Sequence, residues 1–306
     1  MTQALVFPGQ GAQYIGMAGE LAAASPAAAA VLDEADEVLG FALSAIMAEG
    51  PDERLTRTDI SQPAILVASW MAYQTVVERH GPPPVMAGGG LSLGEYSALL
   101  VAGAFTFPDA LRLVRLRGEA MQAAAEASDG GMVALIGADE ATAEALCAAV
   151  RGDDLLQIAN INATGQIVIS GAAQACERAV AGARGHGIRR AMALPVAGAF
   201  HSPLMAPAAE RLSAALDATP VSEPRFPVYA NVDARPVPAD QIRARLVRQL
   251  TQTVRWADCL RAMQAAGATR FLELGPGATI SGMITRTLGA EVTVAKVDRA
   301  ADLDSL

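Results

Sequence analysis

One serine in this sequence stands in a setting that suits nucleophilic catalysis. Residues 90–94 (GLSLG) fit the pattern G-x-S-x-G, which holds a serine on a sharp turn between a strand and a helix. A short apolar stretch precedes the turn and a helical pattern follows it. The start of that helix, near Leu93, offers free N–H groups and a positive dipole end to a developing oxyanion. We therefore predict that Ser92 is a nucleophile; the alternative is an ordinary glycine turn that contains a serine.

A serine nucleophile needs a base, and the chain has 3 histidines. His80 and His186 each close a predicted helix, where a cation favours the negative dipole end, so we interpret both as structural. His201 lies in the loop sequence GAFHSP, between a predicted strand and a predicted helix. It also follows Ser92 along the chain, as the base does in hydrolase-type orders. We predict that His201 is the base.

An arginine falls on the apolar face of the helix predicted for residues 107–127. With 100° per residue, Arg117 lies in the middle of a stripe, whereas Arg112 and Arg115 lie on the opposite, solvated side. A guanidinium keeps its proton, so a buried one needs an anion. The anion is either a core carboxylate or a carboxylate on the substrate, held bidentately. The stripe consists of Ala110, Leu113, Val114, Ala120, Met121 and Ala124.

Alternating strand and helix patterns predict an α/β fold with a mainly parallel sheet. Strands are expected at 4–7, 85–87, 226–230 and 270–274, and helices at 26–38, 60–80, 93–100, 107–127 and 278–288. Residues 131–196 follow the order strand, helix, strand, strand, helix, strand, which is typical of a ferredoxin-like unit. We therefore predict a large domain from residues 1–128 and 198–306, with a ferredoxin-like small domain inserted at 129–197.

Composition limits the classes of partner and the compartment. The net charge is −9 and the only lysine is Lys296, so we expect neither nucleic acid nor a membrane surface as a partner. The 3 cysteines are scattered and predict neither a disulfide framework nor a zinc site. The first residues lack the pattern of a signal peptide, and the apolar stretch 63–77 is too short to span a bilayer. We expect a cytoplasmic protein.

Seven stretches together resemble the malonyl-CoA:acyl carrier protein transacylases, the FabD-type acyltransferase family. They run from one end of the chain to the other, in the family's order and spacing. They are FPGQGAQ at 7–13, GLSLGEYSAL at 90–99, LRGEAMQ at 116–122, NATGQIVISG at 162–171, GAFHSPLM at 198–205, YANVDARPV at 229–237 and ELGPG at 273–277. The resemblance implies a hydrolase-like large domain with a ferredoxin-like small domain.

The resemblance also implies a role for each matching catalytic position. Ser92 would carry the acyl group as an ester, with His201 as its base and then its acid. The backbone N–H groups of Gln10 and Leu93 would form the oxyanion hole. The main-chain carbonyl of Gln249 would orient the histidine, so that a Ser-His dyad works without a third carboxylate.

The resemblance also assigns two positions to the substrate. A third position departs from the family. Arg117 would bind the free carboxylate of malonate, in agreement with the helix argument, and Phe200 fits a malonyl-type pocket. The family usually has histidine where this chain has Leu91. We expect activity to survive, while the apolar side chain changes water access and the balance of transfer against hydrolysis.

The implied activity is transfer of malonyl from malonyl-CoA to the phosphopantetheine thiol of acyl carrier protein. It would proceed by a ping-pong mechanism through malonyl-Ser92, in fatty acid biosynthesis. The resemblance implies no metal or redox cofactor and a monomeric enzyme. Alternatives are a free-standing acyltransferase of polyketide synthesis, a serine thioesterase or other hydrolase, and a carrier-protein-binding module without activity.

Overall fold

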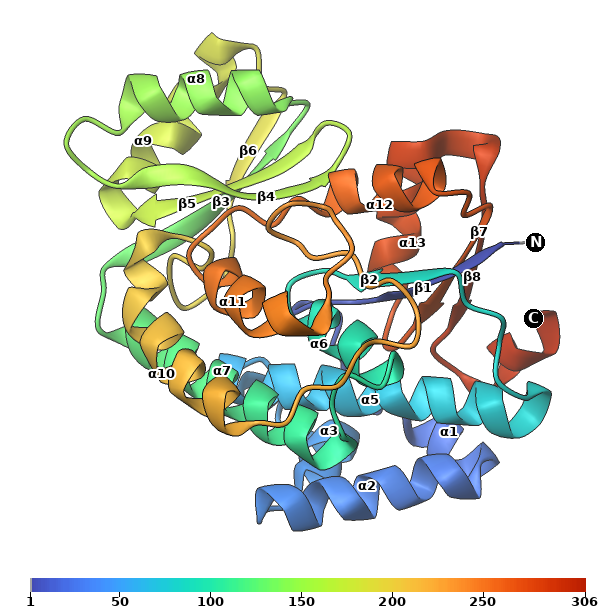
Figure 1. The fold of residues 1–306 in the computed structure, drawn as a ribbon. Coiled ribbons are helices and arrows are strands. Elements are labelled where there is room, and N and C mark those ends of the chain that lie inside the picture. The colour runs from blue at the N-terminus through green and yellow to red at the C-terminus, as the bar shows by residue number, and fades with distance from the viewer. Residues whose placement is uncertain (1) are drawn as a thin grey trace.

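The larger of two sheets is parallel throughout, as predicted. A computed structural model describes residues 2–306. Sheet A has the strand order β2-β1-β7-β8, and every neighbouring pair is parallel (Figure 1). Its strands are β1 (Gln3–Phe7), β2 (Ala87–Gly90), β7 (Arg270–Leu274) and β8 (Thr293–Val297).

Helices cover sheet A on both faces (Figure 1). The helix α5 (Thr58–His80) is buried over most of its length and packs against α7 (Phe107–Glu126) and α2 (Pro26–Leu39). Ser25 caps α2 by accepting a hydrogen bond from the N–H of Ala28. The other helices of this part are α1 (Gly19–Ala24), α3 (Leu43–Glu49), α4 (Asp52–Leu55), α6 (Leu93–Val101), α10 (Ala206–Ala218), α11 (Ala239–Gln249), α12 (Trp256–Ala265) and α13 (Thr279–Leu288).

The second sheet is antiparallel and has the ferredoxin-like order expected for its segment. Sheet B runs β4-β5-β3-β6, and its two helices follow β3 and β5 along the chain. It has its own hydrophobic cluster between sheet and helices. The elements are β3 (Gly130–Ile136), α8 (Glu140–Val150), β4 (Leu156–Ala163), β5 (Gln166–Ala172), α9 (Ala173–Gly182) and β6 (Arg190–Ala193). The exact limits of the small domain, 129–197, stay a prediction.

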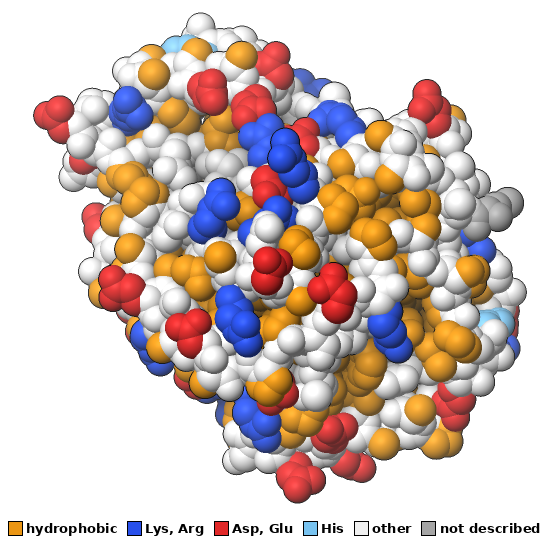
Figure 2. Space-filling view, in the orientation of Figure 1, with side chains coloured by type: hydrophobic (Ala, Val, Ile, Leu, Met, Phe, Trp, Pro, Cys, Tyr) orange, Lys and Arg blue, Asp and Glu red, His pale blue; other side chains and the backbone are white. Residues whose placement is uncertain are grey.

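One ion pair of a small network joins the two parts of the molecule. Arg255, just before α12, pairs with Glu140 of α8 at 2.9 Å and with Asp258 at 2.7 Å. Arg261 pairs with the same Asp258 at 3.0 Å. In Figure 2, basic and acidic side chains gather over this junction between α8 and α12.

Two strand predictions were wrong in detail. The strand expected at 85–87 lies at Ala87–Gly90, so the glycine run is itself the strand and not a turn after it. The strand expected at 226–230 is reduced to isolated bridges, one between Val228 and Gly88 and one from Tyr229 to Pro236. Pro227 explains the second difference, because proline has no N–H to give to a strand ladder.

The register of sheet A brings two distant loops together. Phe7 pairs with Gly90, so β1 and β2 end side by side at their carboxyl ends. The chain continues from these ends into Pro8-Gly9-Gln10 and into Leu91-Ser92. Parallel strands therefore place the first motif next to the predicted nucleophile, where ligands of open α/β sheets bind.

Candidate active site

The backbone at Ser92 has the strained geometry of a nucleophile elbow. Ser92 has φ 51° and ψ −101°, a conformation that a non-glycine residue rarely adopts. Gly90 and Gly94 must be glycine because other backbone atoms lie where a Cβ would stand. A Cβ at Gly90 would lie 2.1 Å from the carbonyl carbon of Gly94, and a Cβ at Gly94 would lie 2.3 Å from the oxygen of Phe7. The turn at the end of β2 is thus the predicted one, packed on β1.

Ser92 and His201 form the predicted dyad. Ser92 Oγ lies 2.8 Å from His201 Nε2, and His201 Nδ1 lies 2.7 Å from the carbonyl oxygen of Gln249. Because a carbonyl only accepts, Nδ1 carries the proton and Nε2 is free to accept one from the serine. Burial, together with the charge of Arg117, lowers the pKa of His201 to about 4. The imidazole is therefore neutral at pH 7 and ready to act as a base.

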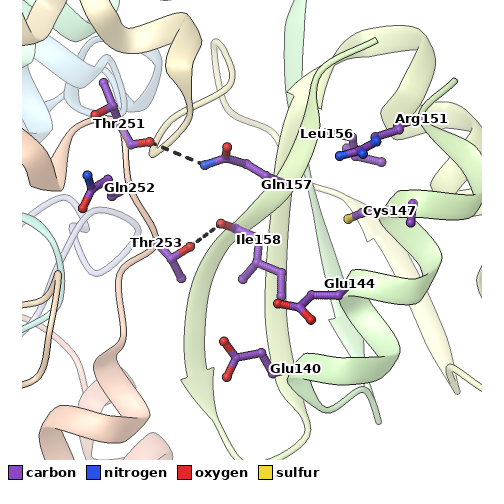
Figure 3. A pocket seen from close by; sticks show the side chains of 11 residues that line it. Glu140, Glu144, Cys147, Arg151, Leu156, Gln157, Ile158, Thr251, Gln252 and Thr253 are labelled. Carbon is purple, nitrogen blue, oxygen red and sulfur yellow. Dashed lines mark hydrogen bonds between the residues drawn. The ribbon is translucent and has the colours of Figure 1, made fainter. Parts of the chain in front are cut away.

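The backbone of His201 is also strained and is held from the small sheet. Its φ is 56°, and Nε2 of Gln157 in β4 donates to its carbonyl oxygen at 3.0 Å. Gln157 belongs to the lining of a separate pocket of about 400 Å³ between α8, β4 and residues 251–253. Figure 3 shows Gln157 bonded to the carbonyl oxygen of Thr251 and Thr253 bonded to that of Ile158. Gln157 thus links this pocket to the backbone of His201.

Arg117 is buried beside the nucleophile, as the helix argument predicts. Only 1% of its surface is exposed. Nη2 donates to Ser92 Oγ and to Gln249 Oε1, both at 3.0 Å, and Nη1 donates to Gln62 Oε1 at 2.5 Å. These partners are neutral, so the alternative of a direct salt bridge to a core carboxylate is wrong. Nε has no partner among residues 2–306 although it is buried. A buried cation with an unused donor is suited to a substrate anion.

Sequence patterns did not reveal the polar side chains behind the dyad. Asn231 accepts from the N–H of Ser92 at 2.7 Å and donates to the oxygen of Gly90 at 2.9 Å. The side chain of Gln249 contacts Ser92, Arg117 and Glu95, in addition to its carbonyl bond with His201. Burial raises the pKa of Glu95 to about 7. The available signal was the place of Glu95 and Asn231 within the motif stretches 90–99 and 229–237.

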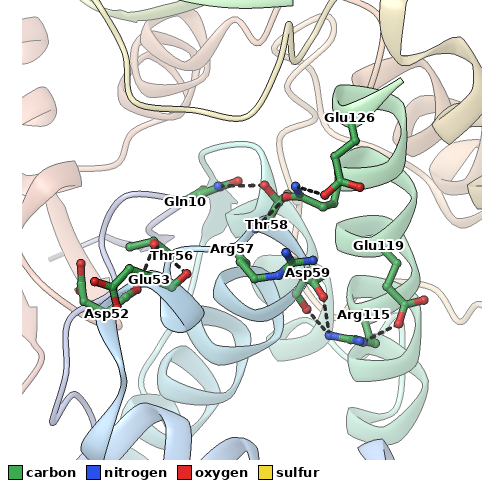
Figure 4. Close-up of polar contacts among 11 residues, drawn as sticks. Gln10, Asp52, Glu53, Thr56, Arg57, Thr58, Asp59, Arg115, Glu119 and Glu126 are labelled. Atoms are coloured by element: carbon green, nitrogen blue, oxygen red, sulfur yellow. Dashed lines mark hydrogen bonds and ion pairs between the residues drawn. The ribbon is translucent and has the colours of Figure 1, made fainter. Parts of the chain in front are cut away.

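The predicted oxyanion groups border the same cavity. A cavity of about 350 Å³ reaches Ser92 and His201, and Gln10, Leu93, Arg117 and Phe200 also line it. Leu93 is the first residue of α6, where an N–H has no partner within the helix. Gln10 follows β1 on the neighbouring loop, and its side chain donates to Thr58 at 3.4 Å, a contact drawn in Figure 4. The role of these N–H groups as an oxyanion hole stays a prediction.

The Gln10 loop rests on the polar start of α5. The backbone N–H of Thr58 donates to Oε1 of Gln122 in α7 at 3.3 Å. Beside it, Asp59 pairs with Arg57 at 3.0 Å and with Arg115 at 3.4 Å (Figure 4). Arg115 also pairs with Glu119 at 2.7 Å, but its side chain is half-buried against α5 and Phe41, so the prediction of a solvated charge holds for Arg112 and is wrong for Arg115.

Leu91 stands at the wall of the cavity next to Ser92. Its side chain is 9% exposed and belongs to a hydrophobic cluster with Val254 and Trp256. The position is therefore apolar, as its residue type suggests.

The other two histidines, Cys147 and Cys176 belong to other parts of the molecule. Cys259 lies next to the polar residues behind the dyad, with its Sγ donating to the carbonyl oxygen of Ala230 at 3.5 Å. His80 Nε2 is 3.2 Å from the oxygen of Leu303, and His186 Nδ1 is 3.2 Å from that of Gly182. All 3 cysteines are free and buried. No helix within residues 2–306 is both long and apolar enough to cross a membrane.

Comparisons with known proteins agree with the motifs. Residues 4–301 match the family described as acyl transferase domain. The malonyl CoA-acyl carrier protein transacylase of Bacillus subtilis is 43% identical over 96% of this chain and 93% of its own. The acyl-carrier-protein-S-malonyltransferase of Bartonella henselae has a TM-score of 0.96 and 41% identity, covering 100% of this chain and 98% of its own. A malonyl-transacylase solved in complex with a type II PKS acyl-carrier protein has a TM-score of 0.96 and 38% identity. This match covers 100% of this chain and 98% of that one.

Proposed function

The chain belongs to the acyl transferase domain family, and from this premise we propose that Ser92, His201 and Arg117 carry out malonyl transfer. The enzyme moves the malonyl group from malonyl-CoA to the phosphopantetheine thiol of an acyl carrier protein, in fatty acid synthesis. One observation supports these residue roles above all. A buried guanidinium donates to the same serine oxygen that contacts His201, so an acyl group on that oxygen would carry its free carboxylate to the arginine.

The first half-reaction forms the malonyl ester. Ser92 Oγ attacks the thioester carbonyl while His201 Nε2 takes the hydroxyl proton. The N–H groups of Gln10 and Leu93 stabilise the tetrahedral oxyanion. The intermediate collapses, the C–S bond breaks, and His201 returns its proton to the departing CoA thiolate. The imidazolium is stabilised throughout by its Nδ1–H bond to the carbonyl of Gln249.

The second half-reaction passes the malonyl group to the carrier. The phosphopantetheine thiol enters the site left by CoA and gives its proton to His201. The sulfur attacks the ester carbonyl, the same donors hold the oxyanion, and Ser92 leaves with the proton from His201. Arg117 holds the malonyl carboxylate in both halves, so the reacting carbonyl stays in register with the oxyanion donors.

The wider setting is part of this proposal. We expect a monomer that acts in the cytoplasm, with no metal or cofactor of its own and with neither nucleic acid nor a membrane as a partner. Three unpaired cysteines suit a reducing compartment, and a net charge of −9 opposes binding to nucleic acid. The carrier protein supplies the phosphopantetheine.

A carrier protein of polyketide synthesis is the second candidate acceptor. A solved relative with 38% identity is a malonyl-transacylase in complex with a type II PKS acyl-carrier protein. The chemistry at Ser92 is the same in both pathways, so assays with carrier proteins of each kind separate them. A pure hydrolase is disfavoured by Arg117, which selects a carboxylated acyl group without helping water to attack.

Intact-mass measurement tests the proposal directly. The protein is mixed with malonyl-CoA or acetyl-CoA, beside the variants Ser92→Ala and Arg117→Ala. The proposal expects a malonyl adduct that requires Ser92, is weak without Arg117, and disappears when carrier protein is added. Steady release of CoA without an adduct would instead indicate a hydrolase. Neither adduct nor release would indicate an inactive carrier-binding module.

A further inference from the structure

We propose that Glu95 is a positioning residue that fixes the amide of Gln249 and, through it, aims Arg117 at the acyl group. The inference rests on the proposed function, because it concerns how the same site prefers a malonyl over an uncharged acyl group. Glu95 itself contacts neither Ser92 Oγ nor the substrate cavity. Its effect therefore has to pass through the side chains between them.

The carboxylate of Glu95 is buried and serves as an acceptor. Only 1% of the residue is exposed, in the first turn of α6. Its Oε2 accepts from the N–H of Asn231 at 3.0 Å and from Nε2 of Gln249 at 2.7 Å. Since Oε2 already accepts from the N–H of Asn231, it carries no proton, and only the NH₂ end of the Gln249 amide can face it.

The other contacts of that amide depend on this orientation. With Nε2 toward Glu95, the same nitrogen also donates to the carbonyl oxygen of Ser92 at 3.0 Å. The opposite end, Oε1, then accepts from Nη2 of Arg117 at 3.0 Å. A flipped amide would set an NH₂ group against the guanidinium and an oxygen against Glu95, so both contacts would become repulsive.

The guanidinium is consequently held from two sides. Gln249 Oε1 engages Nη2, and Gln62 Oε1 engages Nη1. The amide of Gln62 has only a sulfur, Met121 Sδ, as partner for its nitrogen at 3.4 Å, so its orientation is weakly fixed. The firm side of the clamp is therefore the chain from Glu95 through Gln249. It keeps Nη2 3.0 Å from Ser92 Oγ, where a malonyl ester would begin.

Two substitutions at one position separate this role from a merely structural one. Glu95→Met keeps the size of the side chain and removes the acceptor. Glu95→Gln keeps an acceptor, because the N–H of Asn231 and Nε2 of Gln249 both donate to Oε2, and the side-chain carbonyl oxygen of glutamine can take its place. Single-turnover acylation by malonyl-CoA and by acetyl-CoA is measured for each variant by rapid quench and intact mass, with thermal melting as the folding control.

Glu95→Met is expected to slow malonyl acylation at subsaturating malonyl-CoA by about 10- to 100-fold, as for loss of a bond to a charged group. Acetyl acylation should change by less than about threefold, because the dyad and the Gln249 carbonyl are untouched. Glu95→Gln should restore the malonyl preference to within about fivefold of wild type. The loss should lie mainly in the half-saturating malonyl-CoA concentration, since Arg117 binds the carboxylate in ground and transition states alike.

A variant at a second position tests the inference independently, in case Glu95→Met does not fold. Gln249→Met leaves the main-chain carbonyl for His201 and removes the amide, so it should lose malonyl preference to the same extent. The double variant with Glu95→Met should be no worse than either single variant, because both break one chain of contacts.

Equal losses with the two acyl-CoA substrates would overturn the inference, as would a Glu95→Gln protein no better than Glu95→Met. A Gln249→Met protein with the wild-type preference would do the same. Failure of the wild-type protein to form a malonyl adduct would refute the proposed function instead, so the two failures can be told apart.

Discussion

Replacing Arg117 by methionine should convert a malonyl-selective site into an unselective one. Methionine fills the apolar stripe of α7 in place of the arginine stem, so the helix keeps its packing. Two charge-assisted hydrogen bonds to the malonyl carboxylate would be lost. At about 1.5 kcal/mol each, the lower figure for bonds to charged groups, the loss is about 3 kcal/mol, or a roughly 100-fold lower acylation efficiency.

Acetyl-CoA should show the opposite trend. An acetyl group leaves a buried guanidinium facing a methyl group, and burial already lowers the pKa of Arg117. Removing the cation removes this cost, so acetyl acylation should stay constant or rise. Arg117→Lys is the matched control, because it keeps the charge but loses the planar fork and should give an intermediate malonyl rate.

The assay is acylation of Ser92 followed by intact mass at several concentrations of each acyl-CoA. Parallel loss of malonyl and acetyl acylation in Arg117→Met would mean that the arginine supports the dyad and not the substrate. An unchanged malonyl rate would refute the assignment of the carboxylate site altogether.

Four other outcomes follow from the same geometry. Because burial lowers the pKa of His201 to about 4, acylation should persist on the acid side until the pH approaches that value; a pH–rate profile that falls near 6.5 would contradict it. Gln157→Leu removes the hydrogen bond to the carbonyl oxygen of His201 and should lower turnover about fivefold. Gln252→Leu is the control, because Gln252 lines the same pocket but makes no bond to His201. Equal turnover of the two variants would refute the role of Gln157 in holding His201. Leu91→His should raise malonyl-CoA hydrolysis relative to transfer, and equal hydrolysis rates would exclude a role for the apolar wall. Gly94→Ala forces a Cβ to within 2.3 Å of the Phe7 oxygen and should lower stability by more than about 3 kcal/mol, measured by chemical denaturation; a wild-type midpoint would show that β1 can move away.

Local patterns in the sequence predicted the long helices, most strands and the three principal residues, but they gave no indication of β8 at the edge of sheet A or of α11 and α12. The helical period placed Arg117 on a buried stripe, and the G-x-S-x-G pattern placed Ser92 on a strained turn. The order of strands and helices in 131–196 gave sheet B correctly, because period and turn chemistry act over a few residues at a time. Local patterns failed where a strand is formed by backbone alone, without patterned side chains. A run of glycines gives no alternating pattern, so β2 was placed too early.

Only the tertiary structure could assemble the site behind these residues. Asn231 meets Ser92 across 139 residues of chain, and Gln249 meets Glu95 across 154. No period or spacing encodes such pairs, because they depend on how sheet A aligns the ends of its strands and where α11 stops above them. Burial then decides their chemistry. The same folding that hides Glu95 and Arg117 from water makes every unsatisfied polar atom costly, and so allows a few hydrogen bonds to fix where the arginine points.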